Sequence, residues 1–267
     1  MIVISSSLVL EATGTLGANN PVIGYENLTR ITNVTATSAN SSYPVTNVAN
    51  PATNLVWLSA STSTQYLNVI HNRIDPIDYV AIAEHNLGST GATVSVEALN
   101  AGVWSEVVSP VILPEDRPAI FRFSPLSCVG VRLKIVPNGA FPTIAVVHVG
   151  KLLVLPRPIY VGHTPITFGR ETQTTNARSE SGKFLGRIVL RKAKSTSVAL
   201  TQLPRSWYRA NMEPFAKASE ENTFFFAWRP SEFPYETGYT WLTQDPRPVN
   251  STPEGFVDVE LSLGGIA

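Results

Sequence analysis

Period-two alternation of apolar and polar residues is the dominant pattern along this chain. Val94, Val96 and Ala98 alternate with polar neighbours, and the same rhythm returns at 129–135 and 257–263. Successive side chains of a strand point to opposite faces of a sheet. Each segment is therefore predicted to be a strand with one buried and one solvated face.

Three other segments are apolar on both faces: 79–83, 145–155 and 223–228. Continuous apolar runs of this kind are typical of strands that are covered on both sides. We expect central strands here, or strands covered by a second sheet or a second subunit.

Turn signals separate the predicted strands at spacings of roughly 10 residues, a rhythm typical of sandwiches and barrels. One stretch alone has a helical pattern, at 204–222, and Pro214 is predicted to split it into two short turns. The turn signals lie at 88–91, 100–102, 114–118 and 137–139.

The predicted domain boundary is the segment 155–159, where two prolines end an apolar strand. Strands resume after it in a different style, with the helix, most of the aromatic density and a polar loop at 172–182. The fold class is therefore predicted as all-β, with one unit at 1–156 and a second at 157–267, each of ordinary domain size.

Composition and charge narrow the classes of function that the chain can have. The chain is 43% hydrophobic and 15% charged, against a usual charged share of roughly 25%. Low charge suits a subunit that packs against others. The net charge is zero, which argues against specificity for nucleic acid, because that affinity comes largely from neutralised phosphates. The densest basic cluster is interpreted as the solvated edge of a strand: Arg187, Arg191, Lys192 and Lys194.

The cellular compartment is predicted from the number of cysteines and from the hydropathy of the chain. Cys128 is the single cysteine, which excludes an intramolecular disulfide, and it is interpreted as a small buried hydrophobe. Residues 1–10 lack the features of a signal peptide, and no window approaches the roughly 20 apolar residues of a membrane span. We expect synthesis in a reducing cytoplasm and no membrane partner.

No catalytic, metal or cofactor site is predicted from the residue pattern. The histidines lack metal-site spacings, and His148 is expected to be a satisfied core or interface residue. The segment 181–183 lacks the upstream glycine of a phosphate loop. The closest carboxylates flank prolines in predicted turns. These histidines and carboxylates are His71, His85, His148, His163, Asp75, Asp78, Glu115 and Asp116.

Residues 34–154 resemble a discoidin-type (galactose-binding-like) jelly-roll sandwich. The resemblance rests on the segment 36–44, on 47–50 with Trp57, and on the strands 65–69 and 78–82. The segment 84–93 resembles a version of this domain found in bacteriophage tail proteins. The resemblance implies a jelly-roll-like β-sandwich for 1–156, with Trp57 as an anchor that closes one end of the core.

Discoidin-type modules often bind sugars or lipid head groups through loops at one end. In this chain the comparable loop, 59–63, is rich in Ser and Thr and poor in aromatic residues. The resemblance therefore leaves open a module that binds a ligand and a module that serves as a packing scaffold.

Residues 159–267 resemble the tail-tube-related β-barrel of phage distal tail and baseplate proteins. In these families a long polar hairpin precedes the strands, a helix crosses the barrel and an alternating strand closes the chain. The resemblance implies a ring of identical copies joined by the hairpin, although an ordinary surface loop remains the alternative. The candidate interface residues are Thr172, Gln173, Thr174, Asn176, Arg178 and Glu180.

The leading hypothesis is a non-enzymatic virion protein of a phage tail tip or baseplate, made in the host cytoplasm. Its implied partners are copies of itself, other tail proteins such as tube and hub, and a host-surface glycan. The alternative is a carbohydrate-binding module for host attachment, which predicts an aromatic platform at the loop end. A third hypothesis, an enzyme such as a depolymerase, requires two acids placed across a cleft.

Overall fold

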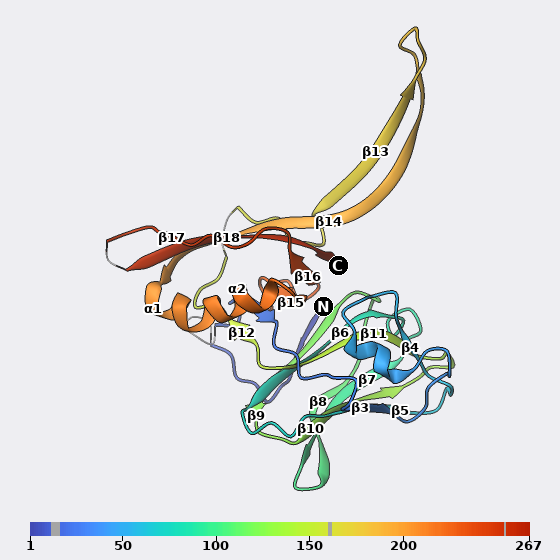
Figure 1. The fold of residues 1–267 in the computed structure, drawn as a ribbon. Helices are drawn as coiled ribbons and strands as arrows, with labels where there is room; N and C mark the ends of the chain where they lie inside the picture. The colour runs from blue at the N-terminus through green and yellow to red at the C-terminus, as the bar shows by residue number, and fades with distance from the viewer. Residues whose placement is uncertain (12–16, 160–161, 254) are drawn as a thin grey trace.

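The computed structural model describes residues 1–11, 17–159, 162–253 and 255–267. Figure 1 shows three β-sheets, a short helical segment and a long two-stranded ribbon that extends away from the body. The predicted all-β class is confirmed. No helix among these residues is both long and apolar enough to cross a membrane.

Two five-stranded sheets form a sandwich. The first sheet has the order β1 (Ile2–Ile4), β9 (Ala119–Leu126), β6 (Ile77–His85), β11 (Thr143–Gly150), β4 (Trp57–Leu58). The second has the order β3 (Val34–Ala36), β5 (Gln65–Ile70), β10 (Gly130–Val136), β7 (Thr93–Asn100), β8 (Val103–Ile112). A 3-10 helix, η1 (Val45–Ala49), lies against β11 and β3.

Alternation fixes which side of the second sheet is buried. In β10, Val131, Leu133 and Ile135 point into the core between the two sheets, and Arg132 and Lys134 lie on the outer face. The antiparallel pairing of β10 with β5 and β7 keeps this register across three strands. The predicted alternation is therefore confirmed at 131–135, where its apolar face closes the sandwich core. At Val129 it is wrong, because this residue precedes β10 and is 43% exposed.

The third sheet explains why β6 and β11 are apolar on both faces. Val80 and Ile82 of β6 face the sandwich core, whereas Tyr79, Ala81 and Ala83 pack against the third sheet. The second cover is thus a sheet of the same chain rather than a subunit. Its strand order is β12 (Leu153–Val154), β2 (Val22–Gly24), β15 (Phe224–Ala227), β16 (Thr237–Leu242), β18 (Phe256–Ile266), β14 (Phe184–Pro204), β13 (Arg170–Arg178), with β17 (Val249–Asn250) paired to β18.

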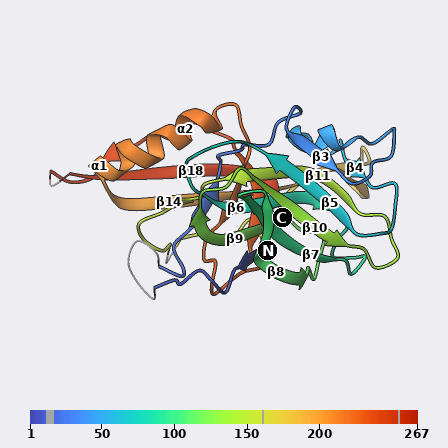
Figure 2. The ribbon, with the colours of Figure 1, turned by 90° about the horizontal axis from the view of Figure 1, so that it is seen from below.

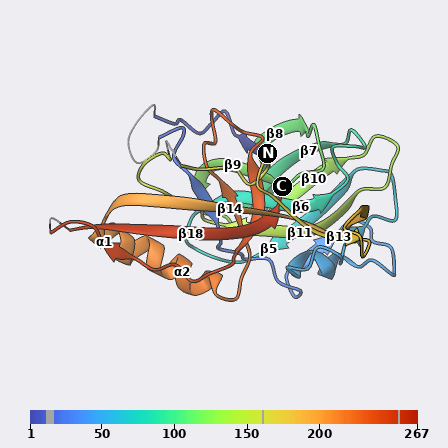
Figure 3. The same ribbon diagram turned by 90° about the horizontal axis from the view of Figure 1, so that it is seen from above.

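The third sheet curls around the helical segment but stays open. Side chains from β2, β14, β15 and β18 form one core with the helix, so its concave side is filled. The strand path ends at β12 and β13 in the described residues, and these two strands are not paired with each other. The predicted barrel or sandwich therefore takes the form of an open, curled sheet. Figures 2 and 3 show β14 and β18 side by side with the helix along one edge.

The helix differs from the prediction in its bounds and its break. It runs as three consecutive segments, α1 (Arg205–Trp207), the π-helical η2 (Tyr208–Met212) and α2 (Glu213–Ser219). The predicted range 204–222 was too long, and a split into two turns at Pro214 is wrong. Pro214 lies in the first turn of α2. Proline clashes with a carbonyl one turn earlier in a regular α-helix, and here the wider π turn precedes it.

The predicted boundary between 156 and 157 stays a prediction, but the two parts share a sheet. β2 and β12 come from the first part, and β2 pairs with β15 of the second. The contact between β2 and the sandwich is close, since a Cβ on Gly24 would lie 2.8 Å from the Tyr79 ring. The Tyr79 hydroxyl donates a hydrogen bond to the Glu26 carbonyl. Glycine at position 24 therefore allows the third sheet to approach the sandwich.

Acidification is expected to destabilise this packing. Burial lowers the pKa of His85 and of His148 from 6.5 to about 4. Their contribution is complete above pH 6.5 and is lost as the pH falls toward 4, because the folded state binds fewer protons. Asp78 opposes this between pH 6 and 3.8, since burial raises its pKa to about 6. Burial also lowers the pKa values of His71, His163 and the N-terminal amino group, so the groups that lose stability on acidification outnumber Asp78. We expect the free energy of unfolding to be lower by at least about 1–3 kcal/mol at pH 4.5 than at pH 7.

Urea unfolding followed by circular dichroism at pH 7.0, 5.5 and 4.5 measures this change. Asp78→Asn keeps an oxygen to accept the Leu152 N–H, a bond of 2.7 Å, but it removes the opposing titration. The variant should therefore lose more stability on acidification than the parent chain. A free energy of unfolding that stays constant or rises toward pH 4.5 would contradict the assignment.

Candidate functional site

The feature that departs most from a compact fold is the ribbon formed by β13 and the first half of β14, residues 170–194, named the arm. Its two strands pair from Arg170↔Lys194 outward, with irregularities at Gln173/Thr174 and Ala177/Arg178. At about 3.3 Å per residue the arm is about 35 Å long. Figure 1 shows it curving away from the sandwich and from the other strands of the third sheet.

Five large apolar side chains of the arm are exposed. Phe184 and Ile188 alternate with Leu185 and Val189 along β14, so apolar groups lie on both faces of the ribbon. An isolated two-stranded hairpin is marginally stable in water, and exposed apolar patches of this kind mark interaction surfaces. The exposed fractions are 64% for Phe184, 66% for Leu185, 64% for Ile188, 48% for Val189 and 59% for Leu190.

The candidate interface residues predicted from the sequence all lie on the arm. The predicted polar loop at 172–182 is for the most part a strand, because Thr172, Gln173, Thr174, Asn176 and Arg178 belong to β13. Glu180 lies in the turn that joins the strands. β13 ends the strand path of the third sheet in the described residues, so its outer edge is unpaired there. The predicted interface role of these residues remains a prediction.

The apolar half of the arm was not predicted from the sequence. The run Phe184 to Leu190 was the available signal, but the basic residues around it led to the interpretation of this strand as a solvated edge. Arg187, Arg191 and Lys192 are indeed exposed on β14, and the Lys194 ammonium group donates a hydrogen bond to the Thr167 carbonyl. The arm carries seven basic and two acidic residues, a net charge of +5 in a chain whose total is zero.

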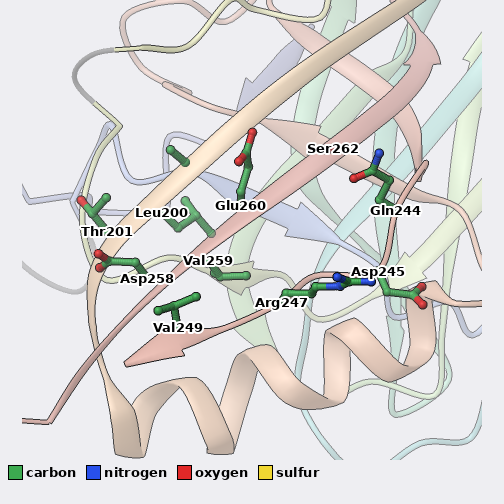
Figure 4. A pocket seen from close by; sticks show the side chains of 11 residues that line it. Leu200, Thr201, Gln244, Asp245, Arg247, Val249, Asp258, Val259, Glu260 and Ser262 are labelled. Atoms are coloured by element: carbon green, nitrogen blue, oxygen red, sulfur yellow. The ribbon is translucent and has the colours of Figure 1, made fainter. Parts of the chain in front are cut away.

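A groove of about 810 Å³ lies at the other end of β14 and β18 (Figure 4). Leu200 and Val259 pack into the core around the helix, so by alternation their neighbours Thr201, Asp258 and Glu260 lie on the opposite, solvated face. Asp258 accepts a hydrogen bond from the Gln202 backbone at 2.6 Å. The lining carries three carboxylates and one guanidinium group. Its residues are Ala199, Leu200, Thr201, Gln244, Asp245, Arg247, Val249, Asp258, Val259, Glu260 and Ser262.

Trp57, the predicted sandwich-end anchor, is fully buried. Its ring belongs to the sandwich core, and its indole N–H donates a hydrogen bond of 3.0 Å to the Ser38 carbonyl. Ser38 also bonds Gln65 and Ser59, at 2.8 and 3.0 Å. The tryptophan therefore ties the loop before η1 to β4 and β5, which fixes the loops at this end of the sandwich.

Two exposed aromatic rings lie at the same end of the sandwich. Leu58 donates a backbone hydrogen bond to Tyr43, and Ser59 donates one to Pro142, the residue after Phe141. Tyr43 is 44% exposed and Phe141 50% exposed. Few aromatics were expected at this end because the expectation rested on the loop 59–63 alone. The fold adds two rings from distant loops.

The structure brings one cysteine–histidine pair together. The Cys128 sulfur lies 3.8 Å from Nε2 of His71. Burial raises the pKa of the Cys128 thiol and lowers the pKa of His71. Both shifts favour the neutral forms, whereas a nucleophilic cysteine needs a lowered pKa. The pair therefore lacks the electrostatics of an activated thiol.

The carboxylates that flank prolines in the sequence have structural partners. Glu115 pairs with Arg117, Asp75 pairs with Arg73, and the Asp116 carboxylate accepts a hydrogen bond of 2.9 Å from the Ser89 backbone. Across the described residues, no three His, Cys, Asp or Glu side chains are grouped so that they could hold a metal ion.

Comparison with known proteins gives structural neighbours only. No family model matches the chain, and no curated protein matches it. Chitosan-binding module 1 of a chitosanase/glucanase from Paenibacillus sp. IK-5 is similar at 14% identity and a TM-score of 0.41, with 46% of this chain and 98% of that chain covered.

Two further neighbours are carbohydrate-binding domains. A family 32 carbohydrate-binding module of C. perfringens NanJ, in complex with galactose, gives 19% identity and a TM-score of 0.40 over 45% of this chain and 92% of its own. A mutant of the lectin binding domain of Lectinolysin, complexed with Lewis b, gives 15% identity and a TM-score of 0.42 over 47% of this chain and 96% of its own. These neighbours are discoidin-like β-sandwiches. At such identities and TM-scores their ligands are not transferred to this chain.

Truncation of Trp57 should destabilise the sandwich more than truncation of a tryptophan on its surface. Trp57→Ala removes a fully buried ring and a hydrogen bond, and we expect a loss of about 3–5 kcal/mol in the free energy of unfolding. The matched control is Trp104→Ala, since Trp104 is half-buried and its ring stacks 4.3 Å from the Arg132 guanidinium group. Urea titration should show a loss below about 2 kcal/mol for the control. Equal losses for the two variants would rule out the anchoring role.

Proposed function

We propose that this chain is a structural subunit that joins copies of itself through the arm. The observation that carries the proposal is the ribbon of residues 170–194, which exposes five large apolar side chains and, in the described part of the chain, a free strand edge outside the core. Because such a ribbon is marginal by itself, a neighbour that covers it would stabilise both. Strand addition at a free edge would supply the backbone hydrogen bonds.

Charge supports a second copy as the neighbour. The arm has a net charge of +5, so the rest of the neutral chain has a net charge of −5. The groove on β14 and β18 contributes Asp245, Asp258 and Glu260. Attraction between a positive arm and a negative surface would speed the encounter of two copies and help to align them. The groove is therefore the proposed binding surface for the arm of a second copy.

The positions of arm and groove support a ring. They lie at opposite ends of β14, whose course is seen in Figure 1 and whose groove end is seen in Figure 4. A contact between two different surfaces of identical subunits is head-to-tail, and such contacts generate rings when the rotation closes. The narrower proposal is a bacteriophage distal tail or baseplate protein, with the curled sheets around a tail channel and the sandwiches outward. Its support is the combination of arm, helix-filled curled sheet and closing strand β18.

A negative charge introduced into the apolar part of the arm should dissociate the proposed oligomer without unfolding the subunit. Leu185→Glu places a carboxylate on a side chain that is 66% exposed in the single chain but covered in the proposed contact. Size-exclusion chromatography with light scattering should show an oligomer for the parent chain and a monomer for the variant. We expect the stability of the monomeric variant to change by less than about 0.5 kcal/mol, because the site is exposed.

Val103→Glu is the matched control, since Val103 is also 66% exposed and lies in a strand of the sandwich. This variant should retain the oligomer. A monomeric parent chain at high protein concentration, or an oligomer that survives Leu185→Glu, would refute assembly through the arm.

Carbohydrate binding at the sandwich end is the second candidate function. It is favoured by Tyr43 and Phe141, which are exposed beside β4, and by Ser41 and Ser42, which precede Tyr43 and are exposed. Sugar sites combine an apolar surface with a few placed polar groups. The two rings supply the apolar surface, and the hydroxyl groups of the exposed serines supply the polar groups.

The double variant Tyr43→Ala/Phe141→Ala should abolish binding to a glycan array if this second function is present. The control is Phe168→Ala, because Phe168 is 60% exposed and belongs to the segment before the arm. Binding by the parent chain should be retained in the control. A parent chain that binds no glycan on the array would remove this candidate and leave the assembly proposal intact.

A further inference from the structure

A second cavity lies at the junction of the sandwich, η1 and the end of α2. Its volume is about 660 Å³, within the usual range of small-molecule sites. His148 and Thr29 are buried in its wall, and Ile31 and Asn50 lie at its exposed side. Its lining residues are Tyr25, Glu26, Asn27, Thr29, Arg30, Ile31, Thr32, Val48, Ala49, Asn50, Pro51, Val146, His148, Ala218, Asn222 and Thr223.

Two buried polar atoms of this lining have no hydrogen-bond partner among the described residues. They are Nδ1 of His148 and Oγ1 of Thr29, and their residues are 4% and 1% exposed. Most buried polar groups in folded proteins are paired, and an unpaired one is costly because it has lost its water. Two unpaired groups in the wall of one cavity therefore indicate a position where a bound molecule completes the hydrogen bonding.

The surroundings of His148 fix what its free nitrogen can accept. The ring is hydrogen-bonded to the Gly24 backbone and lies edge-on to Phe225, with ring centroids 5.1 Å apart. Burial lowers the pKa of His148 to about 4, so the ring is neutral at physiological pH. Because the bond to the Gly24 carbonyl uses the one N–H of the neutral ring, Nδ1 is an acceptor. The ligand must present an O–H or N–H to it.

The remaining polar groups require both donors and acceptors from the ligand. The Oδ1 atoms of Asn27 and Asn50 accept backbone N–H groups, at 2.9 Å in each case, which leaves their amide N–H groups to donate. The Asn222 amide N–H donates to the Ala218 carbonyl at 2.8 Å, which leaves its oxygen to accept. Hydroxyl groups satisfy both needs, because each donates once and accepts twice.

Of the two charged residues in the lining, Glu26 is paired and Arg30 is exposed to solvent. Glu26 forms an ion pair with Arg73, and the Arg30 guanidinium group donates to the carbonyls of Asn27 and Thr29 at 2.8 Å. A cation would find no unpaired carboxylate here, and the unpaired charge of Arg30 is exposed to solvent, where pairing with an anion gains little. A neutral ligand is therefore favoured.

From this geometry we infer that the cavity between β11, η1 and α2 binds a small neutral polyhydroxylated molecule, which donates to Nδ1 of His148 and bonds Oγ1 of Thr29. The site is separate from the arm and from the exposed rings at the sandwich end. Its walls come from β11 of the sandwich and from the residues after α2, so a bound molecule would also join the sandwich to the third-sheet region.

Thr29→Val tests the inference, because valine keeps the shape of threonine and removes the hydroxyl group. Removal of an unpaired buried hydroxyl should leave the unliganded protein as stable or more stable. The same change should weaken binding about tenfold or more, the effect of losing a hydrogen bond to a buried group. Isothermal titration calorimetry with glycerol, myo-inositol, D-glucose and D-galactose as probes measures the affinity, and urea unfolding measures the stability.

Thr240→Val is the matched control. Thr240 is fully buried, but its hydroxyl group donates to the Phe224 carbonyl at 3.0 Å and it does not line the cavity. This variant should lose stability and retain the affinity of the parent chain. Opposite effects of two identical substitutions would separate a ligand site from a structural role.

Two results would overturn the inference. One is a parent chain that is folded but binds none of the four probes. The other is a high-resolution crystal structure, soaked in the probes, in which water alone occupies the cavity and bonds Nδ1 of His148. The chain carrying Leu185→Glu should bind the probe like the parent chain, so loss of assembly and loss of this site are distinguishable.

Discussion

The rest of the structure depends on the burial of the first sheet on both of its faces. One face of β6 and β11 closes the sandwich core, and the other packs against β2, β15 and β16 of the third sheet. Apolar burial contributes roughly 25 cal/mol per Å², and a layer covered twice gains it on both sides. Because the third sheet is joined in this way, the arm and the groove are held on one support.

This arrangement leaves the elements available for function at the margins of the core. The arm extends beyond the last residues that contact the helix, and its apolar side chains find no cover in the described chain. The groove lies at the far end of β14, beside β18. A positively charged donor and an acidic acceptor on one sheet are what a subunit needs to associate head-to-tail.

The junction cavity follows from the same layering. Where the sandwich meets the end of α2, the two surfaces do not fill the space between them, and polar groups line the gap. His148 illustrates the consequence. It was predicted to be a satisfied core or interface histidine, and it is buried as expected, but one of its nitrogen atoms has no partner within the described part of the chain. Only the position of α2 and of the segment after β2 makes that nitrogen part of a cavity.

The sequence by itself determined the strands, the all-β class and the polar and basic character of the arm, because alternation and turn residues act within a few positions of one another. It also indicated that β6 and β11 are covered twice, but the covering element was decided by tertiary structure. The same holds for Tyr43 and Phe141 at one end of the sandwich and for His71 beside Cys128. These pairs lie far apart in the chain, and only the packing of the sheets brings them together, since short-range patterns carry no information about such distances.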